Sequence, residues 1–192
     1  HFLNWEHPMV AGAMDMVLGS EFGNTSVGII KAAGLTPGTL LLECYFVIVC
    51  PAPKGLRVQR FLPQSSFRIV INSNSEELTE RCSAEWMHAA VRSIPINTAQ
   101  KVVNRMRDQI EQLADHANHI CEARQEPVIR QAHDSMSREL GAEIERLRQL
   151  ARVNPNIRAE EIEALEHDQA GYARYLDGAQ LKLDAVRLAI AT

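Results

Sequence analysis

The spacing of apolar residues predicts strands in the first part of the chain. Residues 25–30 (TSVGII) are strand-like, and residues 39–50 (TLLLECYFVIVC) form an apolar run in which Glu43 is the only charged residue. Residues 56–62 (LRVQRFL) and 67–73 (FRIVINS) alternate apolar with polar positions, which is typical of half-buried antiparallel strands. We therefore expect a small antiparallel sheet with residues 39–50 as its buried central strand.

A helix is predicted ahead of these strands, from Pro8 to about Gly19. Pro8 suits the first helical turn, where its missing N–H is not needed, and Gly19 ends the pattern. The apolar residues at helical spacing are Val10, Ala13, Met14, Val17 and Leu18.

Helical periodicity dominates beyond about residue 80. Ser83 is placed to cap a short helix that runs to Val91. Thr98 is placed to cap a second, very long helix. The long helix carries an apolar stripe that spans about fifty residues, or roughly 75 Å. The residues of the stripe are Val102, Met106, Ile110, Leu113, Ala117 and Ile120, then Val128, Ala132, Met136, Leu140, Ile144 and Leu147. Pro127 lies between the two parts, so we expect a kink or a new helix start there.

A second stripe follows the turn at 153–158 (VNPNIR), on Ile162, Leu165, Tyr172, Leu176 and Leu183. Two one-sided stripes joined by a short loop can bury each other, which predicts a helical hairpin. Residues 184–192 (DAVRLAIAT) then alternate apolar with other residues and favour a strand that returns to the sheet. A helix that continues to the end of the chain is the alternative.

The predicted fold class is therefore α+β. It consists of a small antiparallel sheet with an N-terminal helix, followed by a long helical hairpin (a coiled-coil-like arm) and a C-terminal strand. We divide the chain into a sheet platform (1–80) and the hairpin with its returning segment (81–192), which together form one structural unit.

Composition narrows the class of protein. The chain has 192 residues, of which 46% are hydrophobic, and this excludes a disordered chain. Its formal net charge of −4 argues against a freestanding nucleic-acid binder. No stretch approaches the roughly 18 apolar residues of a membrane span, and no signal peptide is recognised. The chain begins at His1 rather than Met, which suggests a piece of a longer protein.

Motifs for catalysis or cofactor binding are lacking. No GxxxxGK[ST] loop occurs, and Glu21 between the glycines of residues 19–24 (GSEFGN) would repel phosphate. His116 and His119 share a helix face, but two ligands are too few for a closed metal site and Cys121 points away. Asp115, His119 and Glu122 could at most bind stray zinc. We expect no catalytic residue, cofactor or metal in this chain.

The four cysteines are widely spaced without a CxxC pair, which predicts reduced and mostly buried thiols of a cytoplasmic protein. They are Cys44, Cys50, Cys82 and Cys121.

Basic residues provide the candidate contact surface. Lys54, Arg57, Arg60 and Arg68 would give the sheet half a positive edge. Charged strand edges often serve only to prevent aggregation, while contact with a nucleic acid or an acidic protein is the functional alternative. A second basic group, Lys101, Arg105 and Arg107, lies close to the start of the arm.

Several segments resemble a known family along the whole chain. They are WEHPMV (5–10), MDMVLGSEFGNTS (14–26), GTLLLE (38–43), RFLP (60–63), RLRQLARVNPNIR (146–158) and LDAVRL (183–188). The chain resembles the C-terminal region of the RapA (HepA) family of bacterial RNA polymerase-associated ATPases, which belong to the Swi/Snf helicase-like class.

The resemblance implies a parent protein that binds core RNA polymerase and uses ATP and Mg to recycle stalled or post-termination polymerase. Its nucleotide pocket would lie in two RecA-like lobes upstream of His1. This chain would be a non-catalytic accessory domain that packs against those lobes or contacts polymerase, and a nucleic-acid-guiding domain is the alternative. An isolated fragment could also form a homodimer through an apolar patch exposed by loss of its parent.

Overall fold

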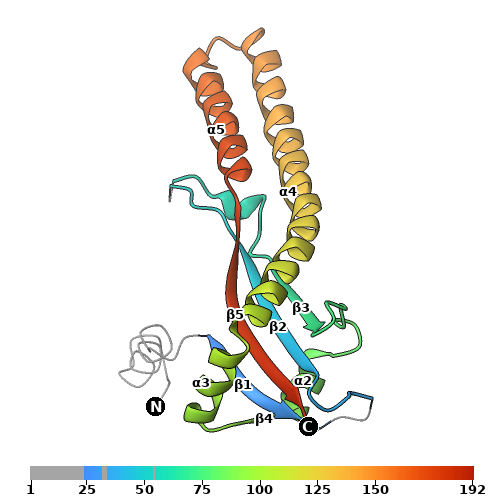
Figure 1. The fold of residues 1–192 in the computed structure, drawn as a ribbon. Coiled ribbons are helices and arrows are strands. Elements are labelled where there is room, and N and C mark those ends of the chain that lie inside the picture. The colour runs from blue at the N-terminus through green and yellow to red at the C-terminus, as the bar shows by residue number, and fades with distance from the viewer. Residues whose placement is uncertain (1–23, 32–33, 54) are drawn as a thin grey trace, which may run out of the picture.

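The structure, a computed structural model, describes residues 24–31, 34–53 and 55–192 (Figure 1). The helix predicted from Pro8 to Gly19 lies outside these residues. The strands are β1 (Thr25–Ile30), β2 (Leu40–Val49), β3 (Ser66–Asn72), β4 (Val91–Ser93) and β5 (Gln180–Ala191). The helices are η1 (Val58–Arg60, a 3₁₀ turn), α2 (Ala84–Ala90), α3 (Ile96–Arg105), α4 (Arg107–Ala151) and α5 (Ala159–Asp177).

The five strands form one sheet in the order β3-β2-β5-β1-β4. The predicted α+β class is confirmed, as is the C-terminal strand that returns to the sheet. The sheet is mixed rather than purely antiparallel, because β5 pairs antiparallel with β2 and parallel with β1. Strands from both predicted segments, 1–80 and 81–192, share this sheet, and the division into segments remains a prediction.

Strand β2 lies between β3 and β5, and its side chains are buried on both faces. Leu42 and Phe46 belong to the cluster packed against α4, whereas Leu41 faces the cluster that includes Met87 of α2. A strand covered on both faces gains from apolar residues at every position, which explains why β2 shows no alternation. The prediction of a buried central strand is confirmed.

One helix connects the sheet to the arm. Helix α4 has 45 residues, or about 68 Å at 1.5 Å per residue. Near its start, Leu113 and Ala117 pack on the sheet, and farther along Met136 and Leu140 pack in a cluster with Leu176 of α5. Figure 1 shows the paired ends of α4 and α5 projecting beyond the sheet as the predicted hairpin.

The start of the long helix differs from the prediction. Thr98 lies inside the separate helix α3, whose N-cap is Pro95, and the helical path breaks at Met106 before α4 begins. No new helix starts at Pro127, because α4 continues through it, and a kink there remains a prediction. Because Pro127 has no backbone N–H, the carbonyl of Ala123 loses its usual helical hydrogen bond. Both residues are exposed, so water can bind that carbonyl instead.

The strand predicted at 56–62 is wrong. This segment forms the 3₁₀ turn η1, with Val58, Phe61 and Leu62 buried against the base of the arm. Their spacing of three and four residues suits a helical turn, and Phe61 meets Tyr172 of α5 edge to face at 5.1 Å between ring centroids. The prediction that Leu183 belongs to the stripe of the returning helix is also wrong, because Leu183 lies in β5.

The short helix predicted after Ser83 is confirmed as α2. The Ser83 hydroxyl accepts a hydrogen bond from the backbone N–H of Trp86 at 3.1 Å. Among the described residues, no helix has the length and apolar character needed to span a membrane.

Candidate functional site

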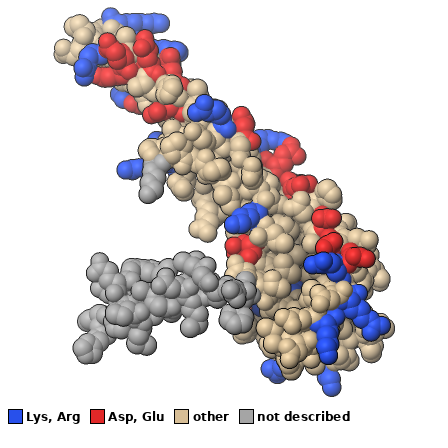
Figure 2. Space-filling model, turned by 60° about the vertical axis from the view of Figure 1, so that its left-hand side comes forward, with Lys and Arg blue, Asp and Glu red and all other residues tan. Residues whose placement is uncertain are grey.

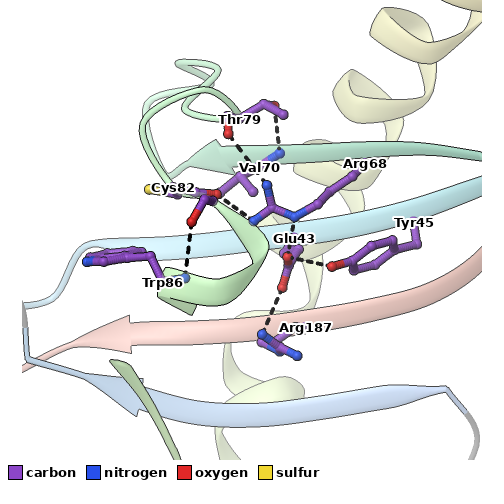
Figure 3. A network of polar contacts seen from close by, with 9 residues as sticks. Glu43, Tyr45, Arg68, Val70, Thr79, Cys82, Trp86 and Arg187 are labelled. Carbon is purple, nitrogen blue, oxygen red and sulfur yellow. Dashed lines mark hydrogen bonds and ion pairs between the residues drawn. The ribbon is translucent and has the colours of Figure 1, made fainter. Parts of the chain in front are cut away.

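A carboxylate is buried in the middle of the sheet. Glu43 of β2 is fully buried, and its neighbours across the sheet are Val70 of β3 and Arg187 of β5. An isolated charge at such a position would cost several kcal/mol, so it requires partners of opposite charge. Figure 3 shows that two arginines from the flanking strands, Arg68 and Arg187, converge on it.

Arg68 makes the closest contacts to Glu43. Its Nε donates to Glu43 Oε1 at 2.5 Å, and its Nη2 donates to the backbone carbonyl of Cys82 at 2.5 Å. The hydroxyl of Tyr45 donates to the same Glu43 oxygen at 2.9 Å. Arg68 therefore ties β2 and β3 to the loop that leads into α2 (Figure 3).

Arg187 completes the cluster from β5. Its Nη1 lies 3.2 Å from Glu43 Oε2, which is ion-pair distance. The two atoms do not have hydrogen-bond geometry, and neither has another hydrogen-bond partner among the described residues. The cluster thus joins three adjacent strands by charge, and its geometry suits a structural role.

The four predicted contact residues have different environments. Lys54 lies outside the described residues, and Arg57 is exposed. Arg60 is 54% exposed and pairs with Glu139 of the arm at 2.8 Å, whereas the Arg68 side chain is only 17% exposed and serves Glu43. Arg60 and Arg68 therefore already have acidic partners within the chain.

The residues considered for metal binding do not converge. His119 Nδ1 lies 3.0 Å from Glu122 on the exposed face of α4, while Cys121 is buried on the opposite side. In the described ranges, no three His, Cys, Asp or Glu residues are grouped to hold a metal ion.

The thiols lie mainly in the core. All four cysteines are free, and three of them are buried, as the sequence predicted. Burial raises the pKa of Cys44 to about 12, with a smaller contribution from the neighbouring Cys121. Burial likewise raises the pKa of Cys121 to about 11. Both thiols are therefore protonated at neutral pH and are poor nucleophiles.

One feature of the sequence points to the Glu43 cluster. A lone charge in an otherwise apolar strand must find partners, so Glu43 itself was recognisable. Arg187 was missed, because the register of β2 with β5 could not be inferred from the spacing of residues along the chain. The fold and site define a class of protein: an α+β domain with a helical arm, held together at its centre by a buried ion cluster.

Comparison with known proteins narrows this class to one family. The family model described as "RNA polymerase recycling family C-terminal" matches residues 1–191, so the chain belongs to this family.

Curated relatives agree with that assignment. The chain is 37% identical over 190 residues to RNA polymerase-associated protein RapA of Pseudomonas aeruginosa, covering 99% of the chain. It is 34% identical over 191 residues to the protein of the same name from Sodalis glossinidius and 33% identical over 192 residues to that from Vibrio campbellii, covering 100% of the chain in both. The chain spans 20% of the length of each relative.

Proposed function

We propose that this chain is the non-catalytic accessory module of an RNA polymerase-associated, ATP-dependent helicase-like motor. The module packs against the upstream ATPase lobes or contacts core polymerase in the cytoplasm, and ATP and Mg bind in those lobes rather than here. The description of the family and the name of its relatives, RNA polymerase-associated protein, support this proposal.

The observation that carries the proposal is the continuity of α4 from the sheet into the arm. Cys121 packs in the cluster on the sheet, and Ala132 packs in the cluster at the base of the arm, within one helix. Because a continuous helix transmits orientation, the sheet fixes the direction in which the arm projects. A rigid projection of this kind suits contact with a second large body.

One exposed ion pair crosses the outer part of the arm, which ends in a turn that exposes an apolar side chain. Arg148 of α4 pairs with Glu166 of α5 at 2.7 Å, across the hairpin. At the turn, Val153 is 81% exposed, and the Asn154 side chain accepts a hydrogen bond from the backbone N–H of Asn156 at 3.0 Å. A protein contact at this end of the arm would cover the exposed Val153 side chain.

The alternative function is a nucleic-acid-guiding domain of the same motor that uses Lys54, Arg57, Arg60 and Arg68. The pairing of Arg60 with Glu139 and of Arg68 with Glu43 counts against this surface. Arg57 is the described member that is exposed without an ion pair in the described part of the chain.

A pull-down with purified core RNA polymerase, at low and physiological salt, tests the proposal. The 192-residue chain is compared with a shortened-arm variant and with Arg57→Glu/Arg60→Glu. The shortened arm replaces residues 142–168 by a short Gly-Ser loop, because Gly141 and Gln169 face each other across the hairpin. A longer protein that includes the upstream lobes is the positive control.

Retention of the chain at both salts, lost in the shortened-arm variant, is the expected result for polymerase contact through the arm. Retention lost only on charge reversal would place the contact at the sheet edge. Retention of the longer protein alone would assign the module to packing against the motor. If neither the chain nor the longer protein were retained, the proposed function would be wrong.

A further inference from the structure

The segment that leads into the arm carries basic residues but no acidic ones. Between Glu85 and Asp108 the chain carries no acidic residue, although the whole chain has a formal charge of −4. Four exposed basic residues lie in this interval: Arg92, Lys101, Arg105 and Arg107. Figure 2 shows several Lys and Arg side chains gathered at the end of the molecule opposite the arm tip.

These cations are largely free of internal partners. Arg107 lies 3.7 Å from Glu111, but both side chains are about 70% exposed, so the pair is weak. Within the described ranges, Arg92, Lys101 and Arg105 form no ion pair. This separates them from Arg60 and Arg68, whose charges are neutralised by Glu139 and Glu43.

Helix α3 orients two of the cations outward. Val102 and Val103 pack against the core cluster of the sheet and fix the inner face of the helix. Asn97, Lys101 and Arg105 follow one another at intervals of four residues, so they form a row along one outer face. We call Lys101 and Arg105 the α3 patch.

A groove adjoins the α3 patch, because its lining residue Asn104 lies three residues from Lys101 on α3. It has a volume of about 450 Å³ and lies between β1 and α3. Half of its lining residues are polar (Thr25, Ser26, Ser93, Gln100 and Asn104), and half are apolar (Val27, Ile94, Ile96, Ala99 and Val103). Hydroxyl and amide side chains beside Lys and Arg are the usual ligands of nucleic-acid phosphate and sugar groups.

We infer that the α3 patch and its groove bind the sugar-phosphate backbone of a nucleic acid, without reading its sequence. No Phe, Tyr or Trp occurs between Trp86 and Tyr172, so α3 offers neither a platform for base stacking nor the aromatic anchors typical of protein interfaces. The cations and hydroxyl groups match phosphate instead. This inference goes beyond the accessory role proposed above and does not depend on contact with polymerase.

Fluorescence anisotropy with a labelled 20-nucleotide single strand and a 20-base-pair duplex tests the inference from 50 to 300 mM salt. The 192-residue chain is compared with Lys101→Ala/Arg105→Ala. The matched control is Arg57→Ala/Arg60→Ala, which removes the same charge from the edge that the sequence indicated. Circular dichroism confirms that each variant is folded.

Loss of two phosphate contacts should weaken binding at least tenfold at 50 mM salt in the Lys101→Ala/Arg105→Ala variant. It should also reduce the slope of log K against log salt by about 1.4–1.8, at 0.7–0.9 per phosphate. The control variant should stay within about twofold of the unmodified chain.

Three results would overturn the inference. The first is an absence of binding by the unmodified chain at 50 mM salt, and the second is an equal loss in both variants, which would indicate only a net-charge effect. The third is unchanged polynucleotide binding combined with reduced retention on polymerase, which would make an acidic protein surface the partner.

Discussion

Two groups of basic residues in this molecule differ in what surrounds them. Arg68 and Arg187 converge on the buried carboxylate of Glu43 and join three strands. Lys101 and Arg105 lie on an exposed face of α3 without an ion pair among the described residues. Both groups look alike in the sequence, yet the first is part of the fold and the second is available to a partner. Burial and pairing, rather than residue type, separate the two roles.

The largest effect is expected when the buried cluster loses its carboxylate. Glu43→Gln keeps the shape of the side chain but leaves two partly buried guanidinium groups without a counter-charge. Removing one partner of a buried ion pair costs about 3–5 kcal/mol of unfolding free energy, which urea denaturation would measure. The control is Glu111→Gln in the exposed pair with Arg107, where a loss of less than about 1 kcal/mol is expected. Equal losses in the two variants would remove the distinction between buried and exposed pairs.

A smaller effect is expected where β4, which leads into α3, approaches β1. A Cβ at Gly28 would lie 2.5 Å from Val91 Cγ1 and 2.6 Å from the backbone oxygen of Arg92. Gly28→Ala should therefore cost about 1–3 kcal/mol of unfolding free energy, because backbone has to move. Gly141→Ala is the matched control, since its Cβ would come no closer than 4.0 Å to Gln169. That control should raise stability by about 0.5–1 kcal/mol through helix propensity, and equal losses in both variants would contradict the close approach at Gly28.

Alkaline pH should weaken the core beneath the sheet. The pKa values of Cys44 and Cys121 are raised by burial to about 12 and about 11, from an ordinary value of 9.0. A raised pKa gives stability that is fully present below pH 9 and is lost as the pH rises toward 11 and 12, because the unfolded chain releases these protons first. Urea denaturation at several pH values would show this decline.

The fall in unfolding free energy at alkaline pH should be shallower in Cys44→Ala than in the unmodified chain. Each protein is compared with its own unfolding free energy at pH 7. Tyr45→Phe separates the phenol, whose pKa is also raised by burial, from the thiols. A profile that remained equally steep in Cys44→Ala would contradict the assignment to Cys44.

The smallest effect on stability is expected in the α3 patch. Lys101→Ala/Arg105→Ala removes two exposed charges and leaves the inner face of α3 unchanged, so unfolding free energy should change by less than about 0.5 kcal/mol. Thermal or urea denaturation at physiological salt measures this change. A loss above about 2 kcal/mol would mean that these residues help to hold the fold.

Local patterns predicted those elements whose environment is set by nearby residues. The apolar run of β2, the alternation in β5 and the paired stripes of α4 and α5 each predicted an element correctly. The break at Met106 and the 3₁₀ turn at Val58 were missed, because a stripe continues across a break and a short turn shares its composition with a strand.

The site was predictable only in part, for a related reason. Glu43 is visible as a lone charge in an apolar run, but its partners depend on pairings between distant segments. Arg68 comes from the next strand along the chain, whereas Arg187 reaches Glu43 only because β5 returns from the arm to pair with β2. The same pairings place Arg68 beside Glu43, and they therefore count against the positive edge inferred from composition.

A double-mutant cycle between Glu43 and Arg68 tests the distinction between the two groups of basic residues most directly. Urea denaturation would be measured for the unmodified chain, Glu43→Gln, Arg68→Met and the double variant. The structure predicts a coupling energy of about 1–3 kcal/mol, because the two side chains share a buried ion pair with a 2.5 Å hydrogen bond. The contrary result is a loss of unfolding free energy in the double variant that equals the sum of the two single losses to within about 0.5 kcal/mol. Arg68 would then not be an internal partner of Glu43, and its charge would be available to bind a partner.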